Sequence, residues 1–385
     1  MLKTLLYDLL SAQPDAKIKY HGGGEYIKSL FKYLITTNDG EYQVIVFYDK
    51  DSYLDDWIYF LLEQYRIESF NVSNNRELQD LLDSVSSRCD ILYTGLMSTF
   101  NNITFPKNLA VVCTLHGLRS LEIGFDSYKK YYISTPKYVK ELIKLFMKKQ
   151  IDRDKIQRIS SQLKKYDRVI ASSIHTEYAI KTWLDCGCIK QLEAAYPPPL
   201  TCDGIEVEDE EKTKTIGKYA LMISADRYEK NICRAIAAFD DLFSKNLLSD
   251  TKVIICGGIP KRFKKRIVNP SYFIEYGYVT SSFLQALFKN CDFFVYPSVN
   301  EGFGYPPLEA MQYGKTCIVS AVCSLTEICG NVPYYINPFD VKEIENRILQ
   351  AHINKKDPER VIQQYQNINR SQISSVQRIK EYILG

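Results

Sequence analysis

The sequence predicts two α/β domains, each a parallel sheet wrapped by helices, which face each other across a cleft. Short apolar runs of strand length alternate with longer helical stretches from end to end, as in doubly wound sheets. A length of 385 residues is long for one core and comfortable for two. Between the two series of runs, residues 196–218 are rich in proline, glycine and acid and have no apolar periodicity, which indicates a linker.

The predicted strands form two series. The first is 18–20, 42–48, 67–72, 91–94, 109–115 and 168–172; the second is 219–224, 252–256, 272–276, 293–296, 316–320 and 334–336. We therefore expect domains over 1–200 and 218–365, a linker over 201–217 and a C-terminal helix over 366–385.

Composition limits the partners, the cysteine chemistry and the location that we expect for this protein. The net charge of +3 is too small to argue for a nucleic-acid partner. The eleven cysteines are odd in number and spread along the chain, and several of them, such as Cys113, Cys256 and Cys317, lie in apolar runs. We therefore expect them to be small core residues of a protein in a reducing compartment, and we expect neither disulfides nor a zinc site. Because we find no charged-then-apolar leader and no apolar run of membrane-spanning length, we expect a cytoplasmic protein.

The most informative stretch is FFVYPSVNEGFGYPPLEAMQYG, residues 293–314. An apolar strand is followed by a glycine-containing loop, and Pro306 and Pro307 then stand where proline is tolerated, in the opening turn of a helix. Unpaired backbone N–H groups and the helix dipole make such a helix start a site for phosphate or diphosphate. Gly302 and Gly304 allow the backbone to approach a ligand closely.

Two carboxylates bracket this phosphate site. Glu301 lies in the loop and Glu309, eight positions later, is expected in the first helical turn. Carboxylates accept hydrogen bonds from paired hydroxyls, which ribose and hexose rings offer. The arrangement therefore suits a nucleotide-sugar.

The segment YPSVNEGFGYPPLEAM resembles the signature of the family-4 retaining glycosyltransferases of the GT-B fold, among the glycosyl transferases group 1. The resemblance implies a GT-B architecture, in which the final helix crosses back to the first domain. It implies that Glu301 contacts the donor sugar and Glu309 the ribose, with Gly302, Phe303 and Gly304 lining the donor. Tyr305 departs from the pattern, where leucine is more usual.

Two loops of the first half extend the resemblance. In HGGGEY, directly after the run 18–20, Gly22, Gly23 and Gly24 match a Gly-Gly loop that would close over the donor or acceptor, although a plain tight turn explains them equally well. In LHGL, His116 resembles a strand-end histidine that contacts a hydroxyl of the donor sugar. Gly117 replaces an aspartate found in many members, and a purely structural histidine is the alternative.

The second half contributes two further loops. SADRYEKN, residues 224–231, places Arg227 and Lys230 where the resembling family grips the diphosphate. Cations at a helix start oppose its dipole, so they need an anion. Gly257 and Val279 follow the next two strands and, by resemblance, lie near the nucleotide and its base.

Residues 128–168 carry thirteen Lys and Arg against four Asp and Glu. Within them, 136–150 predicts a basic amphipathic helix. Such a helix either lies on an anionic membrane, as would suit a lipid-linked acceptor, or packs its apolar face into the core. The sequence leaves both open.

Taken with the resemblance, the sequence predicts a retaining hexosyltransferase that uses a UDP- or GDP-sugar and a saccharide or lipid-linked saccharide acceptor in surface polysaccharide biosynthesis. We expect no cofactor and no metal, because Arg227, Lys230 and helix amides would neutralise the diphosphate and we find no Asp-x-Asp motif. The expected location is the cytoplasm, with contact at the inner face of the plasma membrane through 128–168 left open. The alternatives are a catalytically silent GT-B partner of another glycosyltransferase and a sugar-nucleotide epimerase. The nucleotide, sugar, acceptor and oligomeric state stay open.

Overall fold

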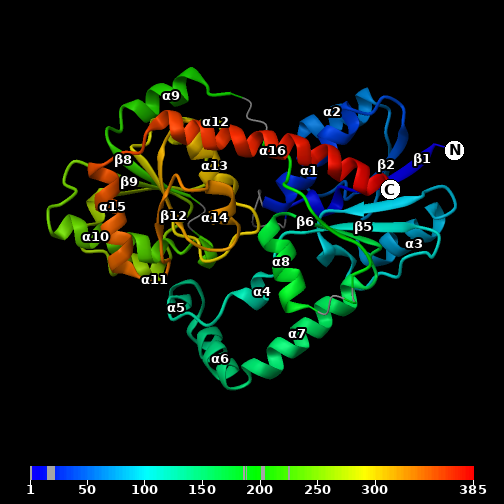
Figure 1. The fold of residues 1–385 in the computed structure, drawn as a ribbon, viewed down its shortest axis with the longest axis horizontal. Helices are drawn as coiled ribbons and strands as arrows, with labels where there is room; N and C mark the ends of the chain where they lie inside the picture. The colour runs from blue at the N-terminus through cyan, green and yellow to red at the C-terminus, as the bar shows by residue number, and fades with distance from the viewer. Residues whose placement is uncertain (1, 15–21, 185–186, 188, 201–203, 224–225) are drawn as a thin grey trace. The chain divides into compact units, whose positions relative to one another are not determined.

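The computed structural model describes the chain except for residues 1, 15–21, 185–186, 188, 201–203 and 224–225 (Figure 1). It forms two compact units. The first unit comprises Met1–Leu118, Arg153–Thr201 and Arg370–Gly385, and the second comprises Arg119–Asp152 and Cys202–Asn369. Among the described residues, no helix has the length and apolarity that crossing a bilayer requires.

The first unit contains a seven-stranded sheet of order β3-β2-β1-β4-β5-β6-β7, and its neighbouring strands pair in parallel. Its strands are β1 (Lys3–Asp8), β2 (Tyr42–Tyr48), β3 (Glu68–Asn71), β4 (Ile91–Thr94), β5 (Ala110–Leu115), β6 (Arg168–Ala171) and β7 (Leu192–Ala194). The longer helices between them are α1 (Gly22–Thr36), α2 (Asp56–Gln64), α3 (Asn75–Val85) and α8 (Ile174–Trp183).

The second unit repeats this topology in a six-stranded parallel sheet of order β10-β9-β8-β11-β12-β13. Its strands are β8 (Tyr219–Met222), β9 (Lys252–Cys256), β10 (Phe273–Tyr276), β11 (Phe293–Tyr296), β12 (Thr316–Ser320) and β13 (Tyr334–Ile336). Its helices include α9 (Val207–Lys214), α10 (Ile232–Ser244), α11 (Lys261–Lys264), α12 (Ser281–Asn290), α13 (Tyr305–Gln312), α14 (Ser324–Cys329) and α15 (Val341–Ile353). Strands β8, β11 and β12 are buried along their whole length, as expected for parallel strands covered on both faces.

The predicted fold class, two doubly wound α/β sheets, is confirmed. Strands β2, β4, β9, β11, β12 and β13 have the predicted bounds. The sequence prediction missed β7 and also β1, which lies in the middle of the first sheet. The predicted strand 18–20 lies outside the described residues.

The units differ from the predicted domains in three respects. Residues Arg119–Asp152 belong to the second unit, although the prediction placed them in the first. Helix α9 lies within the predicted linker and is attached to α12, since the Glu206 N–H donates to the Ser282 hydroxyl at 2.9 Å. The C-terminal helix α16 begins earlier than predicted and runs over Pro358–Leu384. Its last part belongs to the first unit, where Val376 and Ile379 join the core.

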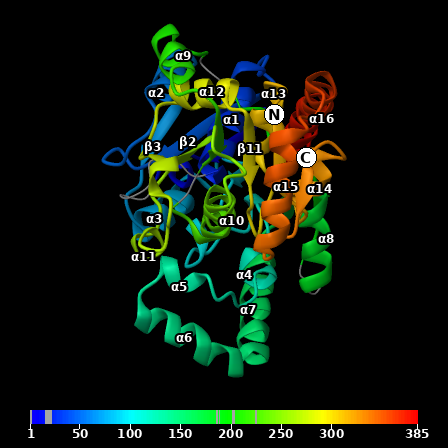
Figure 2. The same ribbon diagram turned by 90° about the vertical axis from the view of Figure 1, so that its left-hand side faces the viewer.

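We call Arg119–Asp152 the basic arm. It contains α4 (Arg119–Glu122), α5 (Lys129–Tyr132), α6 (Thr135–Phe146) and the start of α7 (Lys148–Leu163). In Figure 2, α5 and α6 follow one another at the edge of the second unit, and α6 stands clear of the six-stranded sheet. Tyr128, Tyr131 and Tyr132 pack against the core of the unit.

A buried ion pair anchors the arm. The Arg234 guanidinium on α10 donates to both carboxylate oxygens of Asp126, at 2.8 and 2.6 Å, and both side chains are less than a tenth exposed. The Tyr228 hydroxyl donates to the same carboxylate at 2.7 Å. Burial alone would raise the pKa of Asp126, but the hydrogen bonds from Arg234 and Tyr228 outweigh burial and the pKa is lowered.

Asp126→Asn should destabilise the second unit by about 3 kcal/mol, because it leaves Arg234 buried without a counter-charge. The measurement is the midpoint of urea unfolding. Asp250→Asn is the matched control, since it removes an ion pair with Lys218 in which both side chains are more than half exposed. Equal midpoint shifts in the two variants would contradict this account of the anchor.

The ion pair between Asp126 and Arg234 also predicts how the stability of the protein depends on pH. A carboxyl whose native pKa is lowered stabilises the fold fully above its unfolded pKa, about 3.9 for aspartate, and loses that contribution as the pH falls through the native value. The wild-type midpoint should therefore fall more steeply below about pH 4 than the Asp126→Asn midpoint. If the midpoints of the two proteins changed in parallel with pH, the predicted contribution of the Asp126 carboxylate would be contradicted.

Candidate active site

The candidate site lies where the strand order of the second sheet reverses. Strand β8 has β9 on one side and β11 on the other, so the connections leaving β8 and β11 run to opposite faces of the sheet. Ligands of open α/β sheets bind in the crevice at this point, beyond the carboxyl ends of the strands. The loop after β8 carries Arg227 and Lys230, and the loop after β11 carries Glu301.

The centre of the site is an ion pair between Lys230 and Glu301. The Lys230 ammonium donates to Glu301 Oε1 at 2.6 Å, and both side chains are less than a tenth exposed. The same oxygen accepts from the Tyr296 hydroxyl at 2.8 Å and from the Ser298 hydroxyl at 2.6 Å. Lys230 also donates to the Tyr296 hydroxyl. The two residues predicted separately as sugar and diphosphate ligands are thus in direct contact.

The environment fixes the charge of this pair. Burial alone would raise the pKa of the Glu301 carboxyl, but the charge of Lys230 and the donated hydrogen bonds outweigh burial and lower it, so Glu301 is an anion. Burial lowers the pKa of Lys230, and the negative charge of Glu301, which alone would raise it, only partly offsets this effect. The positive charges of Arg227 and Arg119 lower it further. Two further cations therefore repel the Lys230 ammonium, while Glu301 attracts it.

The two loops are fastened to each other. The backbone carbonyl of Glu229 accepts from the Val299 N–H at 2.8 Å and from the Ser298 hydroxyl at 2.9 Å. Asn231 adopts φ 54°, the left-handed conformation that asparagine tolerates better than most residues. Its side-chain amide donates to the carbonyls of Pro297 and Pro338, at 3.0 and 2.7 Å. Lys230 is therefore held on a rigid frame that also holds Glu301.

The predicted helix start after this loop is confirmed. Helix α13 begins at Tyr305 and contains the two prolines in its first turn. Gly304 precedes it at φ 112°, and a Cβ there would lie 2.7 Å from Leu325 Cδ2, so only glycine fits without strain. The Ser324 hydroxyl donates to the carbonyls of Glu301 and Phe303, at 3.0 and 2.7 Å, which fixes the loop from the other side.

Glu309 is the fifth residue of α13, just past the first turn, in which it was predicted. The buried Gln285 of α12 donates to its Oε1 at 2.9 Å, and Tyr313 donates in turn to Gln285 at 3.0 Å. This chain orients a half-buried carboxylate.

The site also contains cationic and anionic groups that sequence reasoning missed. Arg119 of α4 places Nη1 3.6 Å from Glu229 Oε1, and Arg227 places Nε 3.9 Å from Glu229 Oε2. Arg119 Nε is buried and has no hydrogen-bond partner among the residues that the structure describes. The only sequence signal was its place three residues after His116, which does not reveal that α4 lies on the second unit.

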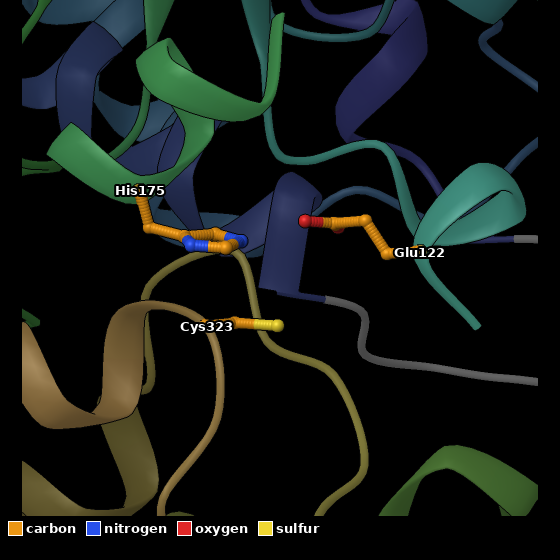
Figure 3. A group of neighbouring side chains, drawn as sticks. All are labelled: Glu122, His175 and Cys323. Atoms are coloured by element: carbon orange, nitrogen blue, oxygen red, sulfur yellow. The ribbon is translucent and has the colours of Figure 1, made fainter. Parts of the chain in front are cut away.

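The other end of α4 touches the signature loop. Asn300 Nδ2 donates to Glu122 Oε2 at 3.0 Å and to Cys323 Sγ at 3.1 Å. Figure 3 shows the Glu122 and Cys323 side chains. Through Arg119 and Glu122, α4 is held against both loops of the site.

Two further predicted residues lie on neighbouring loops. Gly257 follows β9 with φ 103°, and its N–H donates to the Tyr276 carbonyl at 2.8 Å. Val279 is half-buried between β10 and α12. Their contact with a nucleotide stays a prediction.

The predicted residues of the first unit need one correction. Gly22, Gly23 and Gly24 form the first turn of α1 rather than a loop, while His21 and the run before it lie outside the described residues. His116 Nε2 lies 3.0 Å from the Gly95 carbonyl, and its ring meets Tyr26 edge to face. Since a carbonyl only accepts, Nε2 carries the proton in this contact.

Comparison with known proteins finds a match to one family model. Residues 205–367 match the family model "Glycosyl transferases group 1". The matched residues make up less than half of the chain. The match includes both loops that carry Lys230 and Glu301.

Curated relatives agree over parts of the chain. The serotype-specific mannosyltransferase WbdA of Escherichia coli is 45% identical over 81 residues, which are 21% of this chain and 10% of WbdA. This chain thus matches about a tenth of the length of that relative. The O-antigen chain mannosyltransferase RfbU of Salmonella typhimurium is 25% identical over 63% of this chain and 64% of its own.

Solved structures define the fold over the whole chain. The Anabaena protein Alr3699/HepE, crystallised with UDP and glucose, superposes with a TM-score of 0.67 at 15% identity and covers 99% of this chain and 98% of its own. WaaG, a glycosyltransferase involved in lipopolysaccharide biosynthesis, gives a TM-score of 0.60 at 13% identity with complete coverage of both chains. The fold is GT-B, as the resemblance implied.

Glu301→Gln should lower the urea midpoint by an amount equivalent to about 3 kcal/mol, because Lys230 then stays buried without its counter-charge. Combining it with Lys230→Met should recover most of the loss, since removing both charges of a buried pair costs far less than removing one. A double variant no more stable than Glu301→Gln alone would show that the pair is not coupled in this way.

Proposed function

We propose that this protein transfers a glycosyl group from a nucleotide-sugar to an acceptor hydroxyl during synthesis of a surface glycan. The observation that carries the proposal is the buried Lys230–Glu301 pair at the switch point of the second sheet. It offers a cation for the diphosphate and a fixed anion for sugar hydroxyls within one site.

The charges around the pair support a diphosphate as the leaving group. Arg227 lies on the same loop as Lys230, and Arg119 of α4 contacts Glu229 of that loop. The charges of the two arginines already disfavour the protonated form of Lys230. A diphosphate would relieve this repulsion and would be stabilised as it departs. With these cations and the N-terminus of α13 in place, the reaction needs no divalent metal.

The relatives support mannose as the transferred sugar. WbdA and RfbU are both named mannosyltransferases. We therefore place GDP-mannose first among candidate donors. Retention at the anomeric carbon follows from the resemblance of the signature segment to retaining enzymes, with Glu301 orienting the sugar rather than attacking it.

A screen of GDP-mannose and UDP-hexoses in EDTA should show slow release of the nucleoside diphosphate from one donor. Arg227→Gln should weaken binding of that donor by about tenfold, because one charge-assisted contact is lost. Glu301→Gln should lower kcat by about a hundredfold or more, because the sugar loses its fixed anion.

Glu359→Gln, which changes an exposed glutamate of α16, is the matched control and should behave as wild type. NMR of the product should show the anomeric configuration of the donor. Nucleotide binding without turnover in the presence of saccharide and lipid-linked acceptors would favour a silent partner, and release only with a metal would contradict metal independence.

The basic arm supports contact with a membrane. The structure contradicts the alternative that α6 packs its apolar face into the core, because no residue of α6 is buried. Ile143 is 56% exposed and Phe146 is 93% exposed. Val139, Leu142 and Leu145 are exposed beside them, and lysines occupy the opposite side of the helix. We propose that this apolar face enters the surface of an anionic bilayer, at the inner face of the plasma membrane.

Phe146→Ser should reduce binding to vesicles containing phosphatidylglycerol by about tenfold, the equivalent of removing one buried aromatic side chain. Phe60→Ser is the matched control, since Phe60 is 65% exposed on α2. Sedimentation with the vesicles measures binding. Equal binding of the two variants, or no binding of the wild type, would refute the docking proposal.

A further inference from the structure

A lysine-rich pocket lies on the inner side of the basic arm. It has a volume of about 370 Å³, within the range of roughly 300–1,000 Å³ typical of ligand sites. Lys129 and Ile133 line it from the α5 region, and Tyr228 lines it from the loop after β8. Helix α6 contributes Lys137, Lys140, Glu141 and Lys144.

The pocket concentrates positive charge. Four lysines line it against one glutamate, a net charge of +3 by count. Glu141 is shared between Lys144, at 2.6 Å, and Lys129, at 3.5 Å. The hydrogen bond from Lys144 and the charge of Lys129 lower the pKa of Glu141, so it is ionised. Lys137 and Lys140 make no ion pair with any residue that the structure describes.

This arrangement reverses that of an ordinary amphipathic surface helix. Such a helix turns its apolar side inwards and its lysines into water. Helix α6 instead exposes Phe146 and Ile143 and directs lysines into a pocket of its own unit. Like charges brought together repel one another, and an anion between them would reduce that repulsion.

Tyr228 connects the pocket to the active site. It lies between Arg227 and Lys230 in the chain, its ring is 5.2 Å from the Lys129 ammonium, and its hydroxyl donates to Asp126 at 2.7 Å. An anion in the pocket would therefore contact the residue next to the proposed diphosphate ligands.

We propose that this pocket is a second anion site, distinct from the donor site, which binds the phosphate group of a ligand. Several ammonium groups in a concave wall suit a phosphate monoester or diphosphate, because its oxygens accept several charge-assisted hydrogen bonds at once. Its source is either the phosphate of an anionic lipid or a soluble phosphate compound. The inference extends the proposed membrane contact but does not depend on glycosyl transfer.

The test compares two double variants of the full-length protein. Lys137→Gln/Lys140→Gln removes two charges from the pocket, and Lys148→Gln/Lys149→Gln removes two charges from the same arm outside it. Calorimetric binding of inorganic diphosphate should weaken by about tenfold or more in the pocket variant, because two charge-assisted hydrogen bonds are lost. The control variant should stay within about twofold of wild type, because only diffuse surface charge changes.

Vesicles distinguish the two sources. A larger loss of binding to phosphatidic acid vesicles in the pocket variant than in the control identifies a lipid phosphate. Equal vesicle binding by the two variants, with diphosphate binding lost only in the pocket variant, identifies a soluble phosphate. Equal loss of diphosphate binding in both variants, or no diphosphate binding by the wild type, would overturn the proposal. None of these readouts requires turnover, so a failure here is separate from a failure of the donor assay.

Discussion

The buried contact between Lys230 and Glu301 is the interaction on which the geometry of the candidate site depends, because it joins the loops after β8 and β11. Removing two charges from water is costly, and the cost is recovered only when geometry and additional hydrogen bonds are good. Here Tyr296 and Ser298 supply those bonds, while Asn231 and the carbonyl of Glu229 hold the two loops in register. The switch point of the sheet brings the loops together because β8 and β11 are neighbours although β9 and β10 lie between them in sequence. A buried pair with so much support is a weak source of stability but a strong constraint on geometry.

The basic arm gives this site contacts from a part of the chain distant in sequence. Arg119 and Glu122 hold α4 against Glu229 and Asn300, and Asp126 is bound by Arg234 and Tyr228. Tyr228 thus touches the arm through its hydroxyl while its backbone belongs to the turn that presents Lys230. The position of the arm and that of the proposed diphosphate ligands are therefore coupled through Tyr228 and through the α4 contacts. The coupling is local and electrostatic, since it runs through hydrogen bonds and ion pairs.

How much the sequence could reveal depended on whether a signal was local. The strand, loop and helix around Glu301 were predictable because an apolar strand, glycines and prolines all lie within one short segment. The repeated apolar runs along the chain identified both sheets. Strand β1 was missed because a short apolar run at the chain start has no periodic context, although it occupies the middle of its sheet. The glycines at 22–24 were expected in a loop because glycine usually interrupts helices, yet they open α1. Arg119 and Asp126 could not be found, because their partners lie more than a hundred residues away and no local pattern encodes such a pair.

In the proposed reaction, the ion pair must open when the donor binds, and the chemistry of the donor explains why this is feasible. Lys230 cannot leave Glu301 for water, because both are buried and an unpaired charge there is costly. A nucleotide-sugar brings a diphosphate for the ammonium and hydroxyl groups for the carboxylate, so each member of the pair exchanges one partner for another. A nucleoside diphosphate without its sugar satisfies Lys230 but leaves Glu301 with only Tyr296 and Ser298 as donors. The pair between Lys230 and Glu301 therefore favours the intact donor over its product. This preference couples departure of the nucleotide to re-formation of the contact between Lys230 and Glu301.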